Sequence, residues 1–273
     1  MEIPVHIITL TPQAPPVQEL KEQLVAQGIT AILSSGVDGR KEMPPLQEGE
    51  SINQHRSLKM RMIELTPSEV GCYLSHYRII KKAYQSGIPE VCILEDDVLI
   101  EKDFKRILQE IEGLPDEVEF MRLMGLKQHK RKLISLLDHT HWLTRPIKGL
   151  CGTQGYVINR IGMQKVIEAG ASISEPIDKF FDHFWNIPLK SYSIEPHLIW
   201  ERPRTSSSIT KSFKKPSVKS INIRHRRIKL TNSTLRRIYI SKNWNHFHPS
   251  TKTKIPQGKT QHIRIYKTHR NRS

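Results

Sequence analysis

Residues 66–97 read TPSEVGCYLSHYRIIKKAYQSGIPEVCILEDD and contain the strongest structural signals of the chain. A capping box, with a hydroxyl N-cap, a proline at N1 and a carboxylate at N3, is formed by Thr66, Pro67 and Glu69. The sequence therefore predicts a helix from Pro67 to about Ser86. Residues 91–94 (VCIL) follow and predict a strand that is buried on both faces, which is typical of an α/β sheet.

The segments around this stretch support the same fold class. Upstream, a strand over 4–10, a helix over 17–27 and a strand over 29–33 form a βαβ pattern, and 34–57 reads as a loop. Downstream, we expect helices over 104–112, 161–169 and 177–185, and strands over 118–124 and 155–159. The prediction is an α/β domain.

Composition excludes several classes of protein. The chain has 273 residues, of which 37% are hydrophobic and 26% are charged, as expected for a globular protein. No apolar run approaches about 18 residues, so no transmembrane helix is expected, and the first residues lack the pattern of a secretory signal. Three cysteines are too few for a disulfide scaffold and favour a reducing compartment.

The positive charge is concentrated at one end of the chain. The last acidic residue is Glu201, and 20 of the 43 Lys and Arg residues follow it. We therefore predict two regions, a mildly acidic domain over 1–210 and a basic, partly ordered extension over 211–273. An anionic partner would bind the extension.

Three consecutive carboxylates, Glu95, Asp96 and Asp97, follow the predicted buried strand. Like charges repel, and a divalent cation such as Mg²⁺ or Mn²⁺ would compensate them. Ligands of open α/β sheets bind beyond the carboxyl ends of strands, where this triplet would lie. The alternative is a solvated acidic turn.

The helix before the triplet carries polar groups on a largely apolar surface. Ser75, His76 and Arg78 are the polar residues, and His76 reads either as a satisfied core histidine or as part of a site. The pair Gly71 and Cys72 would permit close packing of another segment.

Several segments together resemble glycosyltransferase family 25, the lipopolysaccharide and lipooligosaccharide sugar transferases of Gram-negative bacteria. The similar segments, which span roughly residues 3–210, are HIITL (6–10), SEVGCYLSH (68–76), ILEDDV (93–98), GTQGYVIN (152–159), PID (176–178), PHLI (196–199) and SI (208–209). Two features depart from the family pattern: no basic residue closely follows the first strand, and Ser68 stands where glycine is usual.

The resemblance implies a GT-A-like, single Rossmann-type nucleotide-sugar-binding domain that uses a UDP-hexose donor and Mn²⁺ or Mg²⁺. It implies Asp97 as metal ligand, Glu95 as a partner of the ribose or the metal, and Asp96 as a sugar contact. His76 would contact the donor phosphate or anchor its helix, and Thr9 would adjoin the donor. His197 is a possible further metal ligand. Asp178 is the first choice of general base, ahead of Asp182 and of Glu69, whose N3 position also suits capping.

The resemblance also implies substrates and a location. The reaction would be inverting and β-1,4-galactosyltransferase-like, with UDP-galactose favoured over UDP-glucose and a lipid A-core oligosaccharide as acceptor. The enzyme would be peripheral on the cytoplasmic face of the bacterial inner membrane. Its 211–273 extension would contact the anionic surface, with 221–240 as an interfacial segment.

Two other functions compete with this interpretation. A protein with a degenerate catalytic domain could bind nucleic acid or another anionic surface through its basic extension. No zinc-finger spacing or RNA-binding aromatic signature is present, so nucleic acid is not the expected partner. A metal-dependent phosphohydrolase could also use the acidic triplet, but the sequence lacks a second dense cluster of carboxylates and histidines for two metals.

Overall fold

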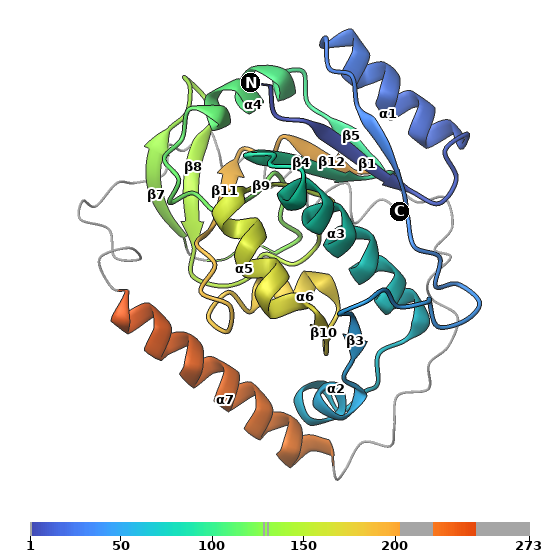
Figure 1. Cartoon of the computed structure of the whole chain (residues 1–273). Coiled ribbons are helices and arrows are strands. Elements are labelled where there is room, and N and C mark those ends of the chain that lie inside the picture. Colours follow the sequence, from blue (N-terminus) through green and yellow to red (C-terminus); the bar gives the residue numbers. More distant parts are fainter. Residues whose placement is uncertain (1, 128, 130, 203–220, 244–273) are drawn as a thin grey trace, which may run out of the picture.

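The computed structural model describes residues 2–127, 129, 131–202 and 221–243. Its centre is a mixed eight-stranded sheet with the order β2-β1-β4-β9-β6-β11-β8-β7 (Figure 1). The strands β2, β1 and β4 are parallel, as are β6 and β11, and the other neighbours are antiparallel. In sheet order, the bounds are Ile32–Ser35, Val5–Thr9, Glu90–Glu95, Gly155–Asn159, Phe120–Arg122, Ser191–Glu195, Trp142–Pro146 and Arg131–Leu136. The predicted α/β class is confirmed.

Helices cover both faces of this sheet. One face carries α3 (Pro67–Gln85), α5 (Arg160–Gly170) and α6 (Ile177–Asp182), and the other carries α1 (Pro15–Ala26) and α4 (Phe104–Glu112). Successive side chains of β4 point to opposite faces, so Val91 and Ile93 enter the first core while Cys92 and Leu94 enter the second. All four are fully buried, which confirms the interpretation of residues 91–94.

The start of α3 follows the sequence prediction closely. The backbone N–H of Glu69 donates to the Thr66 hydroxyl at 3.2 Å, and the Thr66 N–H donates to the Glu69 carboxylate at 2.9 Å. The expected close packing at Gly71 is also present, because a Cβ there would lie 2.6 Å from the Val37 carbonyl oxygen. The Val37 N–H donates to the Ser75 hydroxyl at 2.8 Å, which fixes the segment after β2 against α3.

The structure contains several short helices and strands that the sequence did not predict. The final part of the predicted 34–57 loop contains β3 (Ser51–Ile52) and the start of α2 (Gln54–Arg61). The side chain of Asn53 caps α2 by accepting from the Arg56 N–H at 2.8 Å. The strand β3 pairs with β10 (Ser172–Ile173), and β5 (Val98–Ile100) pairs with β12 (Ile199–Glu201).

The helix α7 (Ile221–Lys242) lies outside the helical layer of α5 and α6 (Figure 1). The Tyr239 ring lies 5.8 Å from Phe184, and the guanidinium of Arg236 lies 5.9 Å from the centre of the Trp185 ring. The predicted domain boundary at residue 210 falls outside the described residues. Of the helices in the described ranges, none has the length and apolarity to cross a bilayer.

Candidate active site

The acidic triplet lies where β4 ends, beside the end of the parallel strand β1. Glu95, Asp96 and Asp97 are all half-buried, and Glu95 is in register with Ile8 of β1. Thr9, the last residue of β1, is buried, and its hydroxyl accepts from the Thr11 N–H at 3.1 Å. The carboxyl ends of two adjacent parallel strands therefore meet here, as in the ligand sites of open α/β sheets.

Contacts from α3 and from the segment before β9 fix the Glu95 carboxylate. Its Oε1 lies 3.5 Å from Nε2 of His76 and accepts from the Thr153 hydroxyl at 2.6 Å. Nδ1 of His76 lies 3.0 Å from the Tyr156 hydroxyl oxygen. His76 is buried, so both of its ring nitrogens face polar atoms of the protein. This position suits the anchoring role considered for His76.

Cys72 lies one helical turn before His76 and marks the centre of the site. Its side chain is exposed, yet burial by surrounding protein, followed by the charges of Glu95, Asp178, Asp97 and Glu69, raises the pKa of its thiol. Coulomb interactions weaken with distance, so the charges of Glu95, Asp97 and Asp178, which belong to segments other than α3, act on the Cys72 thiol from nearby parts of the fold.

Asp178 belongs to the first turn of α6 and is half-buried, with a side chain 31% exposed. Its carboxylate lies 3.0 Å from Nζ of Lys179. Burial opposes the charge of Lys179, but the negative charges of Asp178 and Asp182 outweigh it and raise the pKa of the ammonium. The Asp178 carboxylate is therefore partly accessible and paired with an ammonium.

Asp182 has a different environment from Asp178. It is buried, its Oδ1 accepts from Arg122 at 2.9 Å and from the Cys151 N–H at 3.1 Å, and the Cys151 thiol lies 3.2 Å from Oδ2. Arg122 also donates to the Gly152 carbonyl. A Cβ at Gly149 would lie 2.1 Å from the Asp182 carboxyl carbon. The carboxylate thus holds the 149–152 segment against β6.

The variant Asp182→Ala is expected to lose about 3–5 kcal/mol of unfolding free energy, because it leaves the buried Arg122 charge without its partner. Urea unfolding followed by circular dichroism measures this loss. The matched control is Asp178→Ala, whose half-exposed ion pair is worth at most about 1 kcal/mol. Equal losses in the two variants would contradict the structural role of Asp182.

Glu69 serves the start of α3, although its charge also acts on the Cys72 thiol. The Glu69 carboxylate accepts from the Thr66 N–H and, at 2.6 Å, from Arg61, so both of its oxygens are used. The Arg202 N–H donates to the Asp97 carbonyl at 2.7 Å, at one end of the β5–β12 ladder. His197 lies two residues before the start of β12, and its role as a metal ligand stays a prediction.

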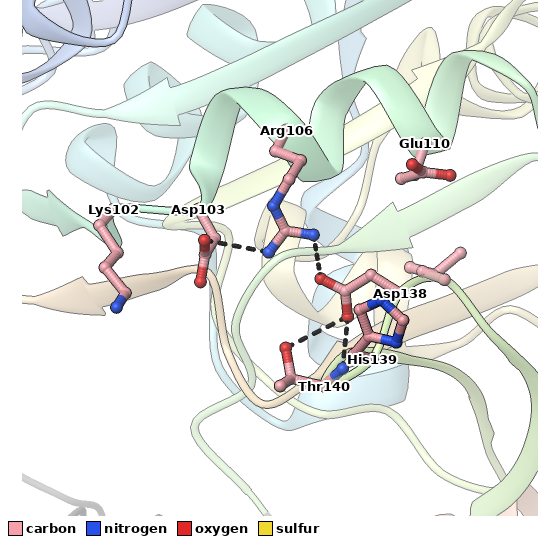
Figure 2. Close-up of a pocket in the computed structure, with 8 residues that line it drawn as sticks. Lys102, Asp103, Arg106, Glu110, Asp138, His139 and Thr140 are labelled. Carbon is pink, nitrogen blue, oxygen red and sulfur yellow. Dashed lines mark hydrogen bonds and ion pairs between the residues drawn. The ribbon is translucent and has the colours of Figure 1, made fainter.

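A pocket of about 610 Å³ opens between the start of α4 and the β7–β8 turn (Figure 2). Arg106 crosses it, paired with Asp103 at 3.0 Å and with Asp138. None of the predicted site residues lines this pocket. Because Arg106, the cation at the centre of this pocket, already has two carboxylate partners, we place the candidate active site around Cys72 instead.

The fold and the acidic site define a class of protein, and comparison of the sequence with known families identifies that class. Residues 2–181 match the family described as "Glycosyltransferase family 25 (LPS biosynthesis protein)". The chain therefore belongs to glycosyltransferase family 25.

Relatives of two kinds share this family. Procollagen galactosyltransferase 1 of Danio rerio is 30% identical over 166 residues, which cover 50% of this chain and 25% of that protein. The glycosyltransferase LgtB of lacto-N-neotetraose biosynthesis in Neisseria meningitidis serogroup B is 27% identical over 172 residues, 51% of this chain and 59% of that protein. LgtE of the same strain is 27% identical over 150 residues, 45% of this chain and 50% of that protein. The chain thus matches about a quarter of the procollagen enzyme and half or slightly more of the Neisseria enzymes.

Proposed function

We propose that the chain transfers a hexose, galactose rather than glucose, from a UDP-sugar to an oligosaccharide acceptor with inversion. The observation that carries the proposal is the acidic triplet at the end of β4, beside the end of β1, in a chain of glycosyltransferase family 25. The names of the relatives support galactose. The names of the Neisseria relatives, which concern lacto-N-neotetraose, support an oligosaccharide acceptor, and we propose one of the lipid A-core type.

The carboxylate ligands at the end of β4 fit a divalent cation that prefers oxygen. Glu95, Asp96 and Asp97 offer carboxylate oxygens, which suit Mn²⁺ or Mg²⁺. In this proposal Asp97 is the principal ligand, Glu95 contacts the ribose or the metal, and Asp96 contacts the sugar. When bound, such an ion supplies positive charge to the diphosphate leaving group.

Asp178 is the proposed general base. An inverting transfer forms one bond from the acceptor oxygen to the anomeric carbon, breaks the bond to UDP and removes the acceptor proton. Asp178 is half-buried on α6 and can receive that proton, with Lys179 beside it. The competing carboxylates of Asp182 and Glu69 are already engaged by Arg122 and by the cap of α3. Of these three carboxylates, Asp178 is therefore the one favoured as general base.

A transfer assay tests this function. The protein, Mn²⁺ and UDP-galactose or UDP-glucose are incubated with a truncated lipid A-core oligosaccharide, and UDP release and acceptor mass are followed. We expect the acceptor to gain one hexose for each UDP released, faster with UDP-galactose. Release of inorganic phosphate from simple phosphate esters, without hexose transfer, would instead indicate the phosphohydrolase.

We also propose that the region 211–273 holds the enzyme on the cytoplasmic face of the inner membrane. On the solvent side of α7, the apolar residues Leu230 and Ile238 are 66% and 47% exposed, and Arg227 and Arg237 are exposed beside them. Basic residues near an anionic bilayer contribute about 1 kcal/mol each, and apolar side chains at the interface add to this.

The double variant Leu230→Ser/Ile238→Ser is expected to bind phosphatidylglycerol vesicles at least about tenfold more weakly, because it removes apolar area from the interface. Vesicle co-sedimentation measures the affinity. The control is Leu46→Ser, which changes a leucine 41% exposed outside α7. Unchanged vesicle binding by the double variant would contradict this role, and preferential binding to duplex DNA would support the nucleic-acid alternative.

A further inference from the structure

Cys72, His76 and Glu95 form a second set of possible metal ligands beside the oxygen-rich triplet. The sulfur, one imidazole nitrogen and one carboxylate oxygen all lie within 4.8 Å of one another. Across residues 2–127, 129, 131–202 and 221–243, no other group of three His, Cys, Asp or Glu side chains meets this spacing. Sulfur and imidazole nitrogen select different cations from those that carboxylates alone prefer.

We propose that Cys72, His76 and Glu95 bind a thiophilic divalent cation of the Zn²⁺ class. Zn²⁺ accepts thiolate, imidazole and carboxylate ligands in a tetrahedral arrangement, whereas Mg²⁺ and Mn²⁺ prefer oxygen. This site is chemically distinct from the oxygen site proposed for the cation of the sugar donor.

The helix α3 and the strand β4 bring these three ligand atoms close together. Cys72 and His76 are four residues apart on α3, a spacing that puts two ligands on one helical face. Nε2 of His76 lies 3.5 Å from Oε1 of Glu95. Metal bonds of about 2.1 Å give a tetrahedral edge of about 3.4 Å. The nitrogen and oxygen ligands therefore need little movement, and the sulfur needs to close the remaining gap.

Neighbouring side chains orient the ligands through hydrogen bonds, as in known metal sites. The Tyr156 hydroxyl lies 3.0 Å from Nδ1 of His76, so it can accept a hydrogen bond from the Nδ1–H and leave Nε2 free to bind a metal. The Thr153 hydroxyl donates to Glu95. Such outer contacts fix the ring orientation and the tautomer of a ligating histidine.

Access to the site comes from the exposed side of Cys72. When the cation binds, the thiol loses its proton to water and a metal–sulfur bond forms, so binding releases one proton and weakens at low pH. Three protein ligands would leave one position of a tetrahedral site for a water molecule. In this respect the site resembles zinc centres with three protein ligands.

One consequence rests on the proposed function. Glu95 belongs to both ligand sets, so a Zn²⁺ ion on Cys72 and His76 would compete with the Mn²⁺-dependent binding of UDP. We therefore expect micromolar Zn²⁺ to weaken UDP binding by the wild-type protein and to have less effect on Cys72→Ser.

The direct test uses Co²⁺ as a spectroscopic probe of the full chain, followed by displacement with Zn²⁺. We expect one Co²⁺ per chain, a cobalt–thiolate charge-transfer band in the near ultraviolet, and loss of the band when Zn²⁺ is added. Cys72→Ser should abolish the band, and Tyr156→Phe should lower the affinity about 10–100-fold. The matched control is Cys151→Ser, which changes the cysteine beside Asp182 and should keep the band.

Three outcomes would overturn the proposal: no thiolate band in the wild-type protein, an unchanged band in Cys72→Ser, or loss of the band only in Cys151→Ser. Thermal unfolding of each apo variant verifies that it is folded, and Cys72→Ser is an exposed substitution that should retain the fold. A wild-type protein that binds Co²⁺ through Cys72 but never binds UDP would support this site and refute the transferase. The failures of the two proposals are thus distinguishable.

Discussion

Replacing Asp97 with Asn is expected to lower kcat/KM for hexose transfer by at least about 100-fold. Asp97 lies two residues after the end of β4, and its negative charge is among those that raise the pKa of the Cys72 thiol. The amide keeps the shape of the side chain but removes the charge that holds the donor's cation, and each such electrostatic contribution to the leaving group is worth about 100-fold or more. Initial rates of UDP release at saturating Mn²⁺ measure the effect.

The matched control for Asp97→Asn is Asp116→Asn, an identical change at an exposed aspartate before β6. It should leave the rate unchanged. If Asp97→Asn kept the wild-type kcat/KM, the triplet would be the solvated acidic turn considered from the sequence, and the donor would have to bind elsewhere.

The second large effect is expected at Asp178. The variant Asp178→Asn should lower kcat by about 10²–10⁴, because a positioned general base contributes that much to proton transfer. Its Mn²⁺-dependent affinity for UDP should remain close to wild type, since Asp178 lies on α6 and not on the triplet. Steady-state rates and UDP titrations on the same preparation measure the two quantities.

The contrast between the two variants is diagnostic. Asp97→Asn should lose both nucleotide binding and turnover, whereas Asp178→Asn should lose turnover alone. A wild-type kcat for Asp178→Asn would exclude Asp178 as the general base. Asp182 and Glu69 would then remain as candidates.

Sequence reasoning was most successful where the signal is local. The capping box before α3 and the apolar run of β4 depend on residues within a few positions of one another, and the structure has both features. The bounds predicted for residues 104–112 and 155–159 match α4 and β9, since a strong apolar pattern defines each.

The parts that sequence reasoning missed depend on partners far along the chain. The strand β3 has two residues and exists through pairing with β10, more than 100 residues away. The edge strand β7 has a half-exposed to exposed side-chain pattern, which gives no buried run to detect. The burial of Asp182 likewise depends on Arg122, 60 residues away. None of these contacts leaves a periodic signal in the local sequence.

Cys72 is the site residue whose importance the sequence concealed. Its spacing of four residues from His76 was visible and would have suggested a shared helical face. The convergence of Glu95, Asp97 and Asp178 on it required the fold, because these residues come from separate segments of the chain.

The central claim is that the surface around Cys72 binds a UDP-sugar through a divalent cation held by the acidic triplet. Isothermal titration of the wild-type protein with UDP, UDP-galactose and UDP-glucose, with and without Mn²⁺, tests it most directly. We expect one nucleotide per chain, binding that requires Mn²⁺, and a preference for UDP-galactose over UDP-glucose. Absence of nucleotide binding under every metal condition would contradict it and would leave the basic 211–273 region as the functional part of the chain.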